Sequence, residues 1–517
     1  MDNIGIINDT CKMLGIERIT PDNVDLDDEN VWKSIRDDTT MIFQWESPSA
    51  QKYLRKFMSD RTLEIAEKRI PNFSKIKWMS FGNGLIRPAC ASFRENVANG
   101  EFYDNGFDAL NEFLAPEAGK IAMQETIMQF LVKFCGYSAA ESDTVRRAIA
   151  KKKGTETLLP EIRDRFVNYT TENYGLTTEK AESVIEAFLQ IILDASAYAF
   201  SWNHSDAYSC IGYISGYLRY YHPYEFIVSA LNTFSDNPEK TVSITNYASR
   251  HKIKISTPKC GISRGNYYYN KNRKVITKGL ASIKYIGNDL AEEMFDIANK
   301  RRYDLFIDVL KELDSCTSIN RRQLEILTKI DFFSDFGNQR EIMQITSLYY
   351  DMFKRGCAKK ISKSKVDGTP IGEIIKKYAV GVTKSGGVAS SYTLLDIDSI
   401  LRDAEIEIKK RGIEDFDDIT KVKNFAEHMG YTGYVSGNDE DRRKLYVLNV
   451  FPCKKRSTGE MFGRTVFTKS IGSGIESKFT IINNIYDKKP VKQGDIIYCK
   501  KYEVDGKYFR MIEYDIL

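Results

Sequence analysis

The spacing of apolar residues changes once along this chain, and that change restricts the fold to two kinds of structure in series. Between residues 177 and 193 the apolar side chains recur at helical steps, and residues 121–134 repeat the pattern. Beyond Tyr431 the period falls to two, in segments rich in β-branched and aromatic residues. We therefore predict a mostly α-helical chain that ends in a β-barrel.

The barrel prediction depends on four alternating segments and one turn. The segments are 444–450, 465–470, 479–485 and 495–502. The last is followed by Val504-Asp505-Gly506-Lys507, a sequence typical of a β-hairpin turn. A fifth strand after this turn would complete a small five-stranded barrel.

Composition and turn residues divide the chain into five predicted segments. Residues 1–55 are too short to fold alone, 56–230 form a helical domain, and 231–340 form a second domain with a short strand. Residues 341–420 contain stretches rich in Lys, Ser and Gly, which predict a linker with short helices. Residues 421–517 hold the barrel.

The cysteines and histidines argue against a zinc site. The nine cysteines and four histidines never fall at the short spacings of metal ligands. The N-terminus has no basic region followed by a long apolar stretch, and the apolar run 188–193 is ended by Asp194. We expect reduced thiols, no bound metal, no membrane partner and a cytoplasmic location.

Positive charge is concentrated in residues 146–153, where five of eight side chains are cationic although the net charge is only +4. Guanidinium and ammonium groups side by side can bind a triphosphate or a nucleic-acid backbone. The same residues also suit a solvated helix end, where cations favour the helix dipole. Both interpretations remain open for this segment alone.

Residues 198–222 combine a polar turn around His204 with a tyrosine-rich helix. An imidazole, hydroxyls and aromatic faces together can contact a base or a phosphate. A well-packed helix whose tyrosines pair their hydroxyls explains the composition equally well.

Several short motifs in order resemble a known family. They are Asp37-Asp38-Thr39-Thr40-Met41-Ile42-Phe43-Gln44-Trp45-Glu46-Ser47, Leu85-Ile86-Arg87-Pro88, Met123-Gln124-Glu125, residues 146–153, residues 200–208 and His222-Pro223. Their order is similar to the fingers of the C-family replicative polymerases of bacteria and phages, the DNA polymerase III alpha subunits. The run Gly279-Leu280-Ala281-Ser282-Ile283-Lys284, with Gly287 and Asn320-Arg321-Arg322, resembles the helix-hairpin-helix region that follows. The barrel resembles that family's OB-fold.

The resemblance implies roles for particular residues. Those expected to bind the incoming dNTP are Arg146, Arg147, Lys151, Lys152, His204, Tyr208, Arg87 and Gln124. Those expected to bind primer-template DNA are Lys284, Gly287, Asn288, Arg321, Arg464 and Lys469. A clamp-binding motif at residues 348–353 would make a sliding clamp a further partner, although an exposed amphipathic helix end explains those residues too.

The chain departs from the family at several positions. Ser201, Trp202 and Asn203 replace an Asn-Lys-Ser sequence, and Ala89-Cys90 follow Arg87-Pro88 where the family has Gly-Pro. Tyr285 stands in place of the first glycine of the hairpin, which puts the phosphate contact there in doubt.

The family's metal-binding carboxylates are expected elsewhere. Residues 3–14 match only the helix that follows the last palm aspartate. Residues 25–28 and 396–398 contain paired aspartates, but they are expected in turns and helix caps, where Asp is common. Mg²⁺ would then be held by the palm of a separate chain, with no cofactor bound by this one.

Three hypotheses follow. The first is a split polymerase, in which this chain supplies the fingers, hairpin domain and barrel and is inactive without a palm-containing partner. The second is a non-catalytic DNA-binding or decoy subunit that engages the replication machinery. The third is a decayed gene fragment, which the intact helical periodicity and the basic motif disfavour.

Overall fold

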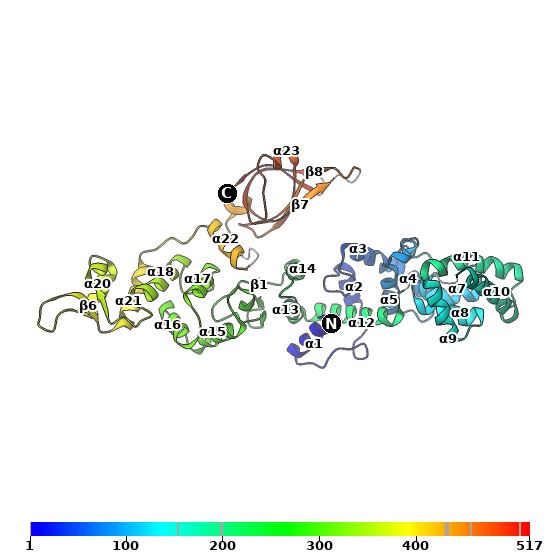
Figure 1. Cartoon of the computed structure of the whole chain (residues 1–517), viewed down its shortest axis with the longest axis horizontal. Helices are drawn as coiled ribbons and strands as arrows, with labels where there is room; N and C mark the ends of the chain where they lie inside the picture. Colours follow the sequence, from blue (N-terminus) through cyan, green and yellow to red (C-terminus); the bar gives the residue numbers. More distant parts are fainter. Residues whose placement is uncertain (1, 152–154, 197–199, 430–433, 455–457, 506–507) are drawn as a thin grey trace. The chain divides into compact units, whose positions relative to one another are not determined.

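The computed structural model describes residues 2–151, 155–196, 200–429, 434–454, 458–505 and 508–517. The chain divides into two compact units, Met1–Arg250 and His251–Leu517. Figure 1 labels their elements, and each unit is described by itself.

The first unit is helical. Its helices are α1 (Asp2–Leu14), α2 (Glu29–Asp37), α3 (Pro48–Phe57), α4 (Asp60–Arg69), α5 (Lys75–Leu85), α6 (Arg94–Ala98), α7 (Asp108–Leu114), α8 (Gln124–Cys135), α9 (Ala139–Ala150), α10 (Thr155–Tyr174), α11 (Thr178–Ser196), α12 (Trp202–Tyr221), α13 (Pro223–Thr233) and α14 (Pro238–Arg250). Two 3₁₀ turns, η1 (Pro88–Cys90) and η2 (Ala115–Glu117), connect some of them. The two helices predicted from periodicity are α8 and α11, and Thr177 caps α11 by accepting from the Lys180 N–H.

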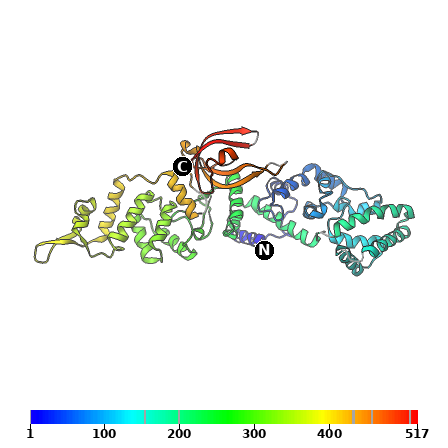
Figure 2. The same cartoon turned by 45° about the horizontal axis from the view of Figure 1, so that its top comes forward.

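Helix α12 packs closely against α5 and α2 because its buried side carries several small residues (Figures 1 and 2). Ser205, Ser209, Gly212 and Gly216 lie on that side. A Cβ added at Gly216 would lie only 2.6 Å from the side chain of Ile35. The Asn83 amide donates to the Ser209 hydroxyl at 3.0 Å, which satisfies a polar pair inside this contact.

A second core lies between α8, α9, α10 and α11. Phe130, Phe134, Phe166 and Phe188 are fully buried there, and the Phe130 and Phe188 rings approach to 4.6 Å. A capping box formed by Ser138 and Glu141 begins α9. The packed face of α9 fixes the direction in which its arginines project.

The second unit mixes helices and strands. Its helices are α15 (Asn288–Lys300), α16 (Phe306–Cys316), α17 (Arg321–Lys329), α18 (Gln339–Ser347), α19 (Lys363–Val366), α20 (Pro370–Lys377), α21 (Ile397–Lys410), α22 (Asp418–Met429) and α23 (Asn483–Tyr486). Its strands are β1 (Ile255–Ser256), β2 (Tyr268–Asn270), β3 (Val275–Thr277), β4 (Lys360–Ser362), β5 (Ala379–Val382), β6 (Val388–Leu394), β7 (Lys444–Lys454), β8 (Met461–Ser470), β9 (Glu476–Ile482), β10 (Ile496–Asp505) and β11 (Tyr508–Ile516). Short turns are η3 (Leu280–Ser282), η4 (Leu348–Met352) and η5 (Asp439–Arg443).

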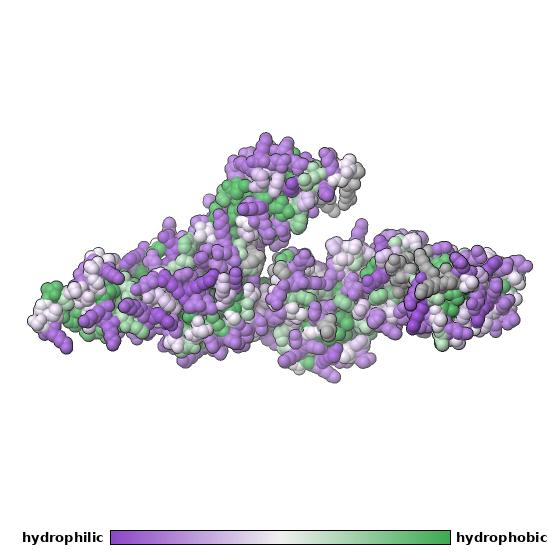
Figure 3. Space-filling model, viewed as in Figure 1, coloured by the Kyte–Doolittle hydropathy of each residue, from purple (hydrophilic) through white to green (hydrophobic). Residues whose placement is uncertain are grey.

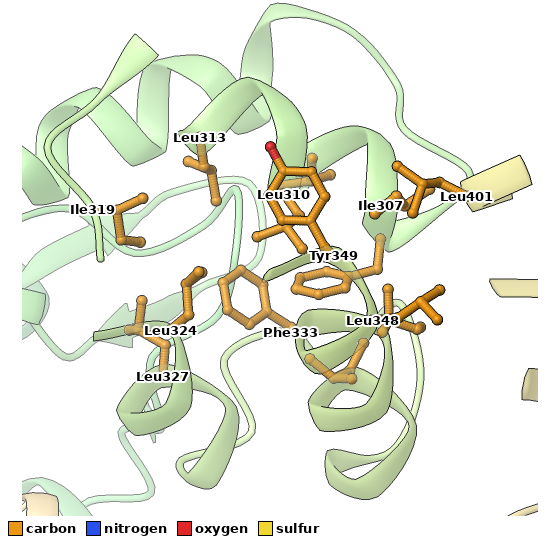
Figure 4. Close-up of a cluster of buried hydrophobic side chains, with 14 of the residues drawn as sticks. Ile307, Leu310, Leu313, Ile319, Leu324, Leu327, Phe333, Leu348, Tyr349 and Leu401 are labelled. Atoms are coloured by element: carbon orange, nitrogen blue, oxygen red, sulfur yellow. The ribbon is translucent and has the colours of Figure 1, made fainter. Parts of the chain in front are cut away.

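The region that the sequence suggested as a linker is folded. Strands β4, β6 and β5 form an antiparallel sheet, and Leu401 of α21 belongs to the same buried core as Leu310 of α16. Figure 4 shows Leu310, Phe333 and Leu401 around this core. The buried carboxylate of Glu405 on α21 accepts from the Phe306 and Ile307 N–H groups at 2.9 and 2.7 Å, so it caps α16 across 98 residues of sequence. The Lys-, Ser- and Gly-rich stretches form β4, α19 and the hairpin that joins β5 to β6.

The C-terminal barrel is confirmed. Its five strands close in the order β10-β11-β9-β8-β7, with β9 and β11 parallel and α23 inserted between β9 and β10. This is the strand arrangement of an OB-fold. The predicted hairpin is the antiparallel pair β10 and β11, whose turn at residues 506–507 lies outside the described residues.

The surface of the molecule is mostly hydrophilic in the view of Figure 3. Among the described residues no helix combines the length and the apolar character that crossing a membrane requires.

Candidate functional site

The candidate site of the first unit begins where two distant segments meet. The Gln124 N–H donates to the Phe200 carbonyl at 2.8 Å, and the Phe200 N–H donates to the Ala122 carbonyl at 2.9 Å. The next side chain, Glu125, accepts from the Ser201 hydroxyl at 2.6 Å and from a backbone N–H at the start of α12 at 3.0 Å. A carboxylate is stabilised at a helix N-terminus. The starts of α8 and α12 are therefore joined.

Two adjacent arginines of α9 share one carboxylate beside this junction. Arg146 donates to the Gln124 side-chain oxygen at 3.1 Å and to Asp143 at 2.9 Å. Arg147 reaches the other Asp143 oxygen at 2.5 Å. The hydrogen bonds to the arginines hold the pKa of Asp143 below its usual range, with that from Arg146 contributing most. The Arg146 side chain is 19% exposed and the Arg147 side chain is 65% exposed, so Arg146 is positioned and Arg147 projects into solvent.

Arg87 completes a third side of the cluster. Its guanidinium lies 4.4 Å from the centre of the Phe200 ring and donates to the Gln44 side-chain oxygen at 3.3 Å. Its buried Nε has no hydrogen-bond partner among the described residues. A cation over an aromatic face is a stabilised arrangement that still leaves N–H groups available.

Tyr208 and His204 follow on the first turns of α12. Tyr208 packs edge to face on Phe43 at 4.9 Å and lies 6.1 Å from Phe200. The exposed His204 ring lies 6.1 Å from Tyr208. Arg87, Gln124, Arg146, Tyr208 and His204 are therefore linked through Phe200.

Of the two lysines predicted to bind nucleotide, one lies at the end of α9 and the other is not described by the structure. Lys151 is exposed and ends α9, where its N–H donates to the Arg147 carbonyl at 3.1 Å. Lys152 lies outside the described residues.

The later tyrosines of α12 have a structural role. The Tyr213 hydroxyl donates to the Asp25 carbonyl and the Tyr221 hydroxyl to the Asp28 carboxylate, both at 2.6 Å. The interpretation as a well-packed helix with paired tyrosine hydroxyls therefore describes the C-terminal part of α12. The aromatic cluster that could contact a base or a phosphate lies at its N-terminal part.

The sequence did not reveal Arg219 as a positioning residue. This arginine is 1% exposed, donates to the Thr40 carbonyl and to the Ser34 carbonyl, and stacks on Tyr247 at 4.9 Å. It holds the loop in which Met41 and Gln44 adopt left-handed φ angles of 64° and 70°. No local pattern in a tyrosine-rich helix distinguishes a buried arginine from an exposed one.

The buried carboxyl of Glu117 lies below the α8 junction. It accepts from the Ala122 and Met123 N–H groups at 2.5 and 3.1 Å and from the Thr126 hydroxyl. Burial raises the pKa of this carboxyl to about 7 against these hydrogen bonds. Glu117 and Trp202 are among the residues that line a cavity of about 310 Å³.

In the second unit, three predicted DNA contacts lie together on exposed surface. Lys284, Gly287 and Asn288 are exposed around the start of α15, and a Cβ at Gly287 would meet nothing within 4 Å. Arg321 is engaged elsewhere, because it pairs with Glu325 at 3.0 Å and with Asp351 at 2.5 Å. The neighbouring Arg322, which the predicted set omits, points instead toward Tyr285.

The two residues predicted on the barrel do not share a surface. Arg464 and Lys469 are five positions apart on β8, so their side chains leave opposite faces of the strand. Arg464 lies 5.0 Å over the Tyr486 ring of α23. Burial lowers the pKa of Lys469, which is half-buried beside Glu476.

The paired aspartates are turn and cap residues, as predicted. Asp28 caps α2, and Asp25 accepts from the Asp27 N–H at 2.9 Å. Asp396 caps α21, and Asp398 pairs with Lys311 at 2.5 Å. Within the described residues no three His, Cys, Asp or Glu side chains are grouped so as to hold a metal ion. The paired aspartates of residues 25–28 and 396–398 therefore do not fit a pair of magnesium ions.

The segment considered for clamp binding packs its apolar side into the core. Leu348, Tyr349 and Phe353 are at most 9% exposed, and Figure 4 shows Tyr349 beside Leu310 and Phe333. The hydroxyls of Tyr349 and Tyr350 donate to Asp314 at 3.0 and 2.8 Å. The apolar side of this turn completes the core while Asp351 is exposed, so residues 348–353 form an amphipathic segment, and clamp binding stays a prediction.

Comparisons with known proteins match two regions of this chain. Residues 3–174 match the finger domain of the bacterial DNA polymerase III alpha subunit, and residues 250–343 match a helix-hairpin-helix motif. Both candidate sites contain residues from these ranges.

Curated relatives carry the name DNA polymerase III subunit alpha. The protein of Ureaplasma parvum is 26% identical over 351 residues, which are 66% of this chain and 34% of that protein. The Campylobacter jejuni protein is 27% identical over 350 residues, covering 66% of this chain and 28% of that protein. The Escherichia coli K12 protein is 27% identical over 323 residues, covering 61% and 26%.

The fold and the two matched regions define a polymerase-type finger domain followed by a helix-hairpin-helix domain and a barrel. The chain is a relative of the DNA polymerase III alpha subunits and resembles the C-terminal half of that subunit. It spans about a third or less of the length of the curated relatives that it matches.

Proposed function

We propose that this chain binds the triphosphate of an incoming dNTP and primer-template DNA as the finger-side part of a split replicative polymerase. A separate palm-containing polypeptide would supply nucleotidyl transfer. The observation that carries the proposal is the arginine cluster, in which Gln124 and Asp143 position Arg146 while Arg147 projects into solvent. The relation to DNA polymerase III alpha subunits supports the same role.

The chemistry of the cluster suits a triphosphate. Guanidinium groups form paired hydrogen bonds with phosphate oxygens. Arg146 and Arg147 share one carboxylate, Asp143, while Arg87 donates to the uncharged Gln44 side chain. Phe200, Tyr208 and His204 offer ring faces and polar atoms next to the cations for the base or sugar.

In this proposal the palm belongs to another polypeptide, because the paired aspartates of this chain serve in turns and helix caps. Asp28 and Asp396 cap helices, and Asp398 pairs with Lys311. Nucleotide transfer in this class of enzyme uses magnesium ions held by carboxylates, which neutralise charge at the reacting phosphates.

The decisive experiment compares extension by the purified chain alone and with the palm polypeptide, which the neighbouring reading frame is expected to encode. We expect no primer extension by the chain alone and extension by the mixture. If the chain binds DNA but the mixture stays inactive, the non-catalytic DNA-binding or decoy role replaces the split polymerase. Extension by the chain alone would contradict the proposal.

Arg147→Ala tests the nucleotide site directly. Loss of a charge-assisted hydrogen bond should weaken dNTP binding at least about tenfold and abolish extension by the mixture, with assembly intact. Arg163→Ala is the matched control, because Arg163 is also a partly exposed arginine that pairs with carboxylates of the same unit. Equal dNTP affinity of the two variants would remove Arg147 from the site.

A further inference from the structure

Tyr285 occupies a backbone conformation that its side chain disfavours. Its φ angle is 75°, in the left-handed region that a residue with a Cβ adopts at an energetic cost. The buried Ile283 and Ile286 anchor the turn on both sides. The Gln323 side chain donates to the Tyr285 carbonyl at 2.7 Å, so a second helix also holds the turn.

This strain presents an aromatic ring to solvent. Tyr285 is 47% exposed, although burial is the usual reason to retain an aromatic side chain in a turn. Glycine would fill the same turn without strain. The turn therefore retains a costly residue whose ring does not contribute to the core.

Two cations lie close to the ring. The Arg322 guanidinium lies 4.0 Å from the ring centre, and the Lys284 ammonium lies 5.2 Å from it. Hydrogen bonding from Lys284, with the nearby charge of Arg322, holds the pKa of the Tyr285 hydroxyl below its usual range. Lys284 and Arg322 are both exposed, so their charges are available to phosphates near the ring.

We propose that Tyr285 stacks on an unpaired base of single-stranded DNA while Lys284 and Arg322 contact the adjacent phosphates. This inference rests on the proposed DNA-binding role and assigns one surface of the second unit to the single-stranded part of the template. A partly exposed ring with two cations beside it matches a strand whose base faces are free. The base faces of a duplex are already stacked on each other and offer the ring no partner.

The test compares the full chain with its Tyr285→Gly and Tyr285→Phe variants on a twelve-nucleotide single strand and on a duplex of equal length. Tyr285→Gly should raise the Kd for the single strand about tenfold and change the duplex Kd less than about twofold. Tyr285→Phe keeps the ring and should bind like the parent. A 2-aminopurine in the single strand should lose fluorescence on binding to the parent and much less on binding to the glycine variant.

A matched control is Tyr268→Ala, because Tyr268 is 40% exposed and also lies near an arginine, Arg264 at 5.7 Å. It should leave both affinities unchanged. Since glycine relieves the strain, thermal stability of the Tyr285→Gly variant should not fall, which separates lost stacking from lost folding.

Three results would overturn the inference. They are an unchanged single-strand affinity of Tyr285→Gly, equal losses on both DNAs, or an unquenched 2-aminopurine with the parent. In each of these cases the parent still binds DNA, and the proposed function stands. If the parent binds neither DNA, the DNA-binding part of the proposed function fails as well, and the two failures are thereby distinguished.

Discussion

Replacing Glu117 by Gln should change how the stability of the first unit depends on pH. Glu117 is 2% exposed, and its pKa is raised to about 7 from an ordinary value of 4.5. Below pH 4.5 the carboxyl is protonated in both the folded and unfolded states. Between pH 4.5 and 7 the folded chain keeps a proton that the unfolded chain releases, so the free energy of unfolding falls as the pH rises. Above pH 7 this contribution is constant.

The size of the effect follows from the pKa difference. Each pKa unit corresponds to about 1.4 kcal/mol, so the wild-type chain should lose about 3 kcal/mol from this group between pH 4.5 and pH 7. Glutamine has no proton to release. It can still accept from the two backbone N–H groups through its carbonyl, while its amide faces the Thr126 hydroxyl. The stability of Glu117→Gln relative to wild type should therefore rise by about 2 to 3 kcal/mol from pH 5 to pH 8.

Urea unfolding followed by tryptophan fluorescence is a suitable assay. All four tryptophans lie in residues 1–250, at positions 32, 45, 78 and 202, so the signal reports the first unit alone. Glu67→Gln is the matched control, because Glu67 is exposed on α4 and its replacement should have a small, constant effect. A stability difference between Glu117→Gln and wild type that is equal at pH 5 and pH 8 would refute the reasoning.

Three further predictions concern folding and reactivity. Gly119→Ala should lower the free energy of unfolding by roughly 2 kcal/mol or more, because the residue has a φ of 79° and a Cβ would lie 2.1 Å from the Tyr103 carbonyl oxygen. Gly175→Ala, with a φ of 67° and nothing within 4 Å, should cost less in the same urea assay. Arg219→Met should destabilise the first unit by about 3 kcal/mol; a loss no greater than that of Arg250→Met, at an exposed arginine, would contradict its positioning role. Iodoacetamide at pH 8 should modify the exposed Cys316 and Cys357 before Cys90 and Cys260, because burial raises the pKa values of the latter two thiols to about 12. Peptide mass mapping measures the order of labelling, and early labelling of Cys90 would contradict the prediction.

The sequence determined the features that depend on neighbours along the chain. Helical spacing located α8 and α11, and alternation located the barrel strands, because side chains repeat every 3.6 residues in a helix and every two in a strand. Capping chemistry is equally local, so Asp28 and Asp396 could be assigned to helix starts. The motif order identified the segments that carry both candidate sites.

Only the tertiary structure decided which side chains are available for binding. Arg321 and Arg322 are adjacent and identical in sequence, yet Arg321 is paired with the distant Asp351 while Arg322 faces Tyr285. Residues 348–353 place their apolar side in the core, and the supposed linker completes a core through Glu405 and Leu401. These outcomes depend on contacts between residues far apart in sequence. Local periodicity carries no information about which remote carboxylate, ring or apolar surface the folded chain brings to each side chain.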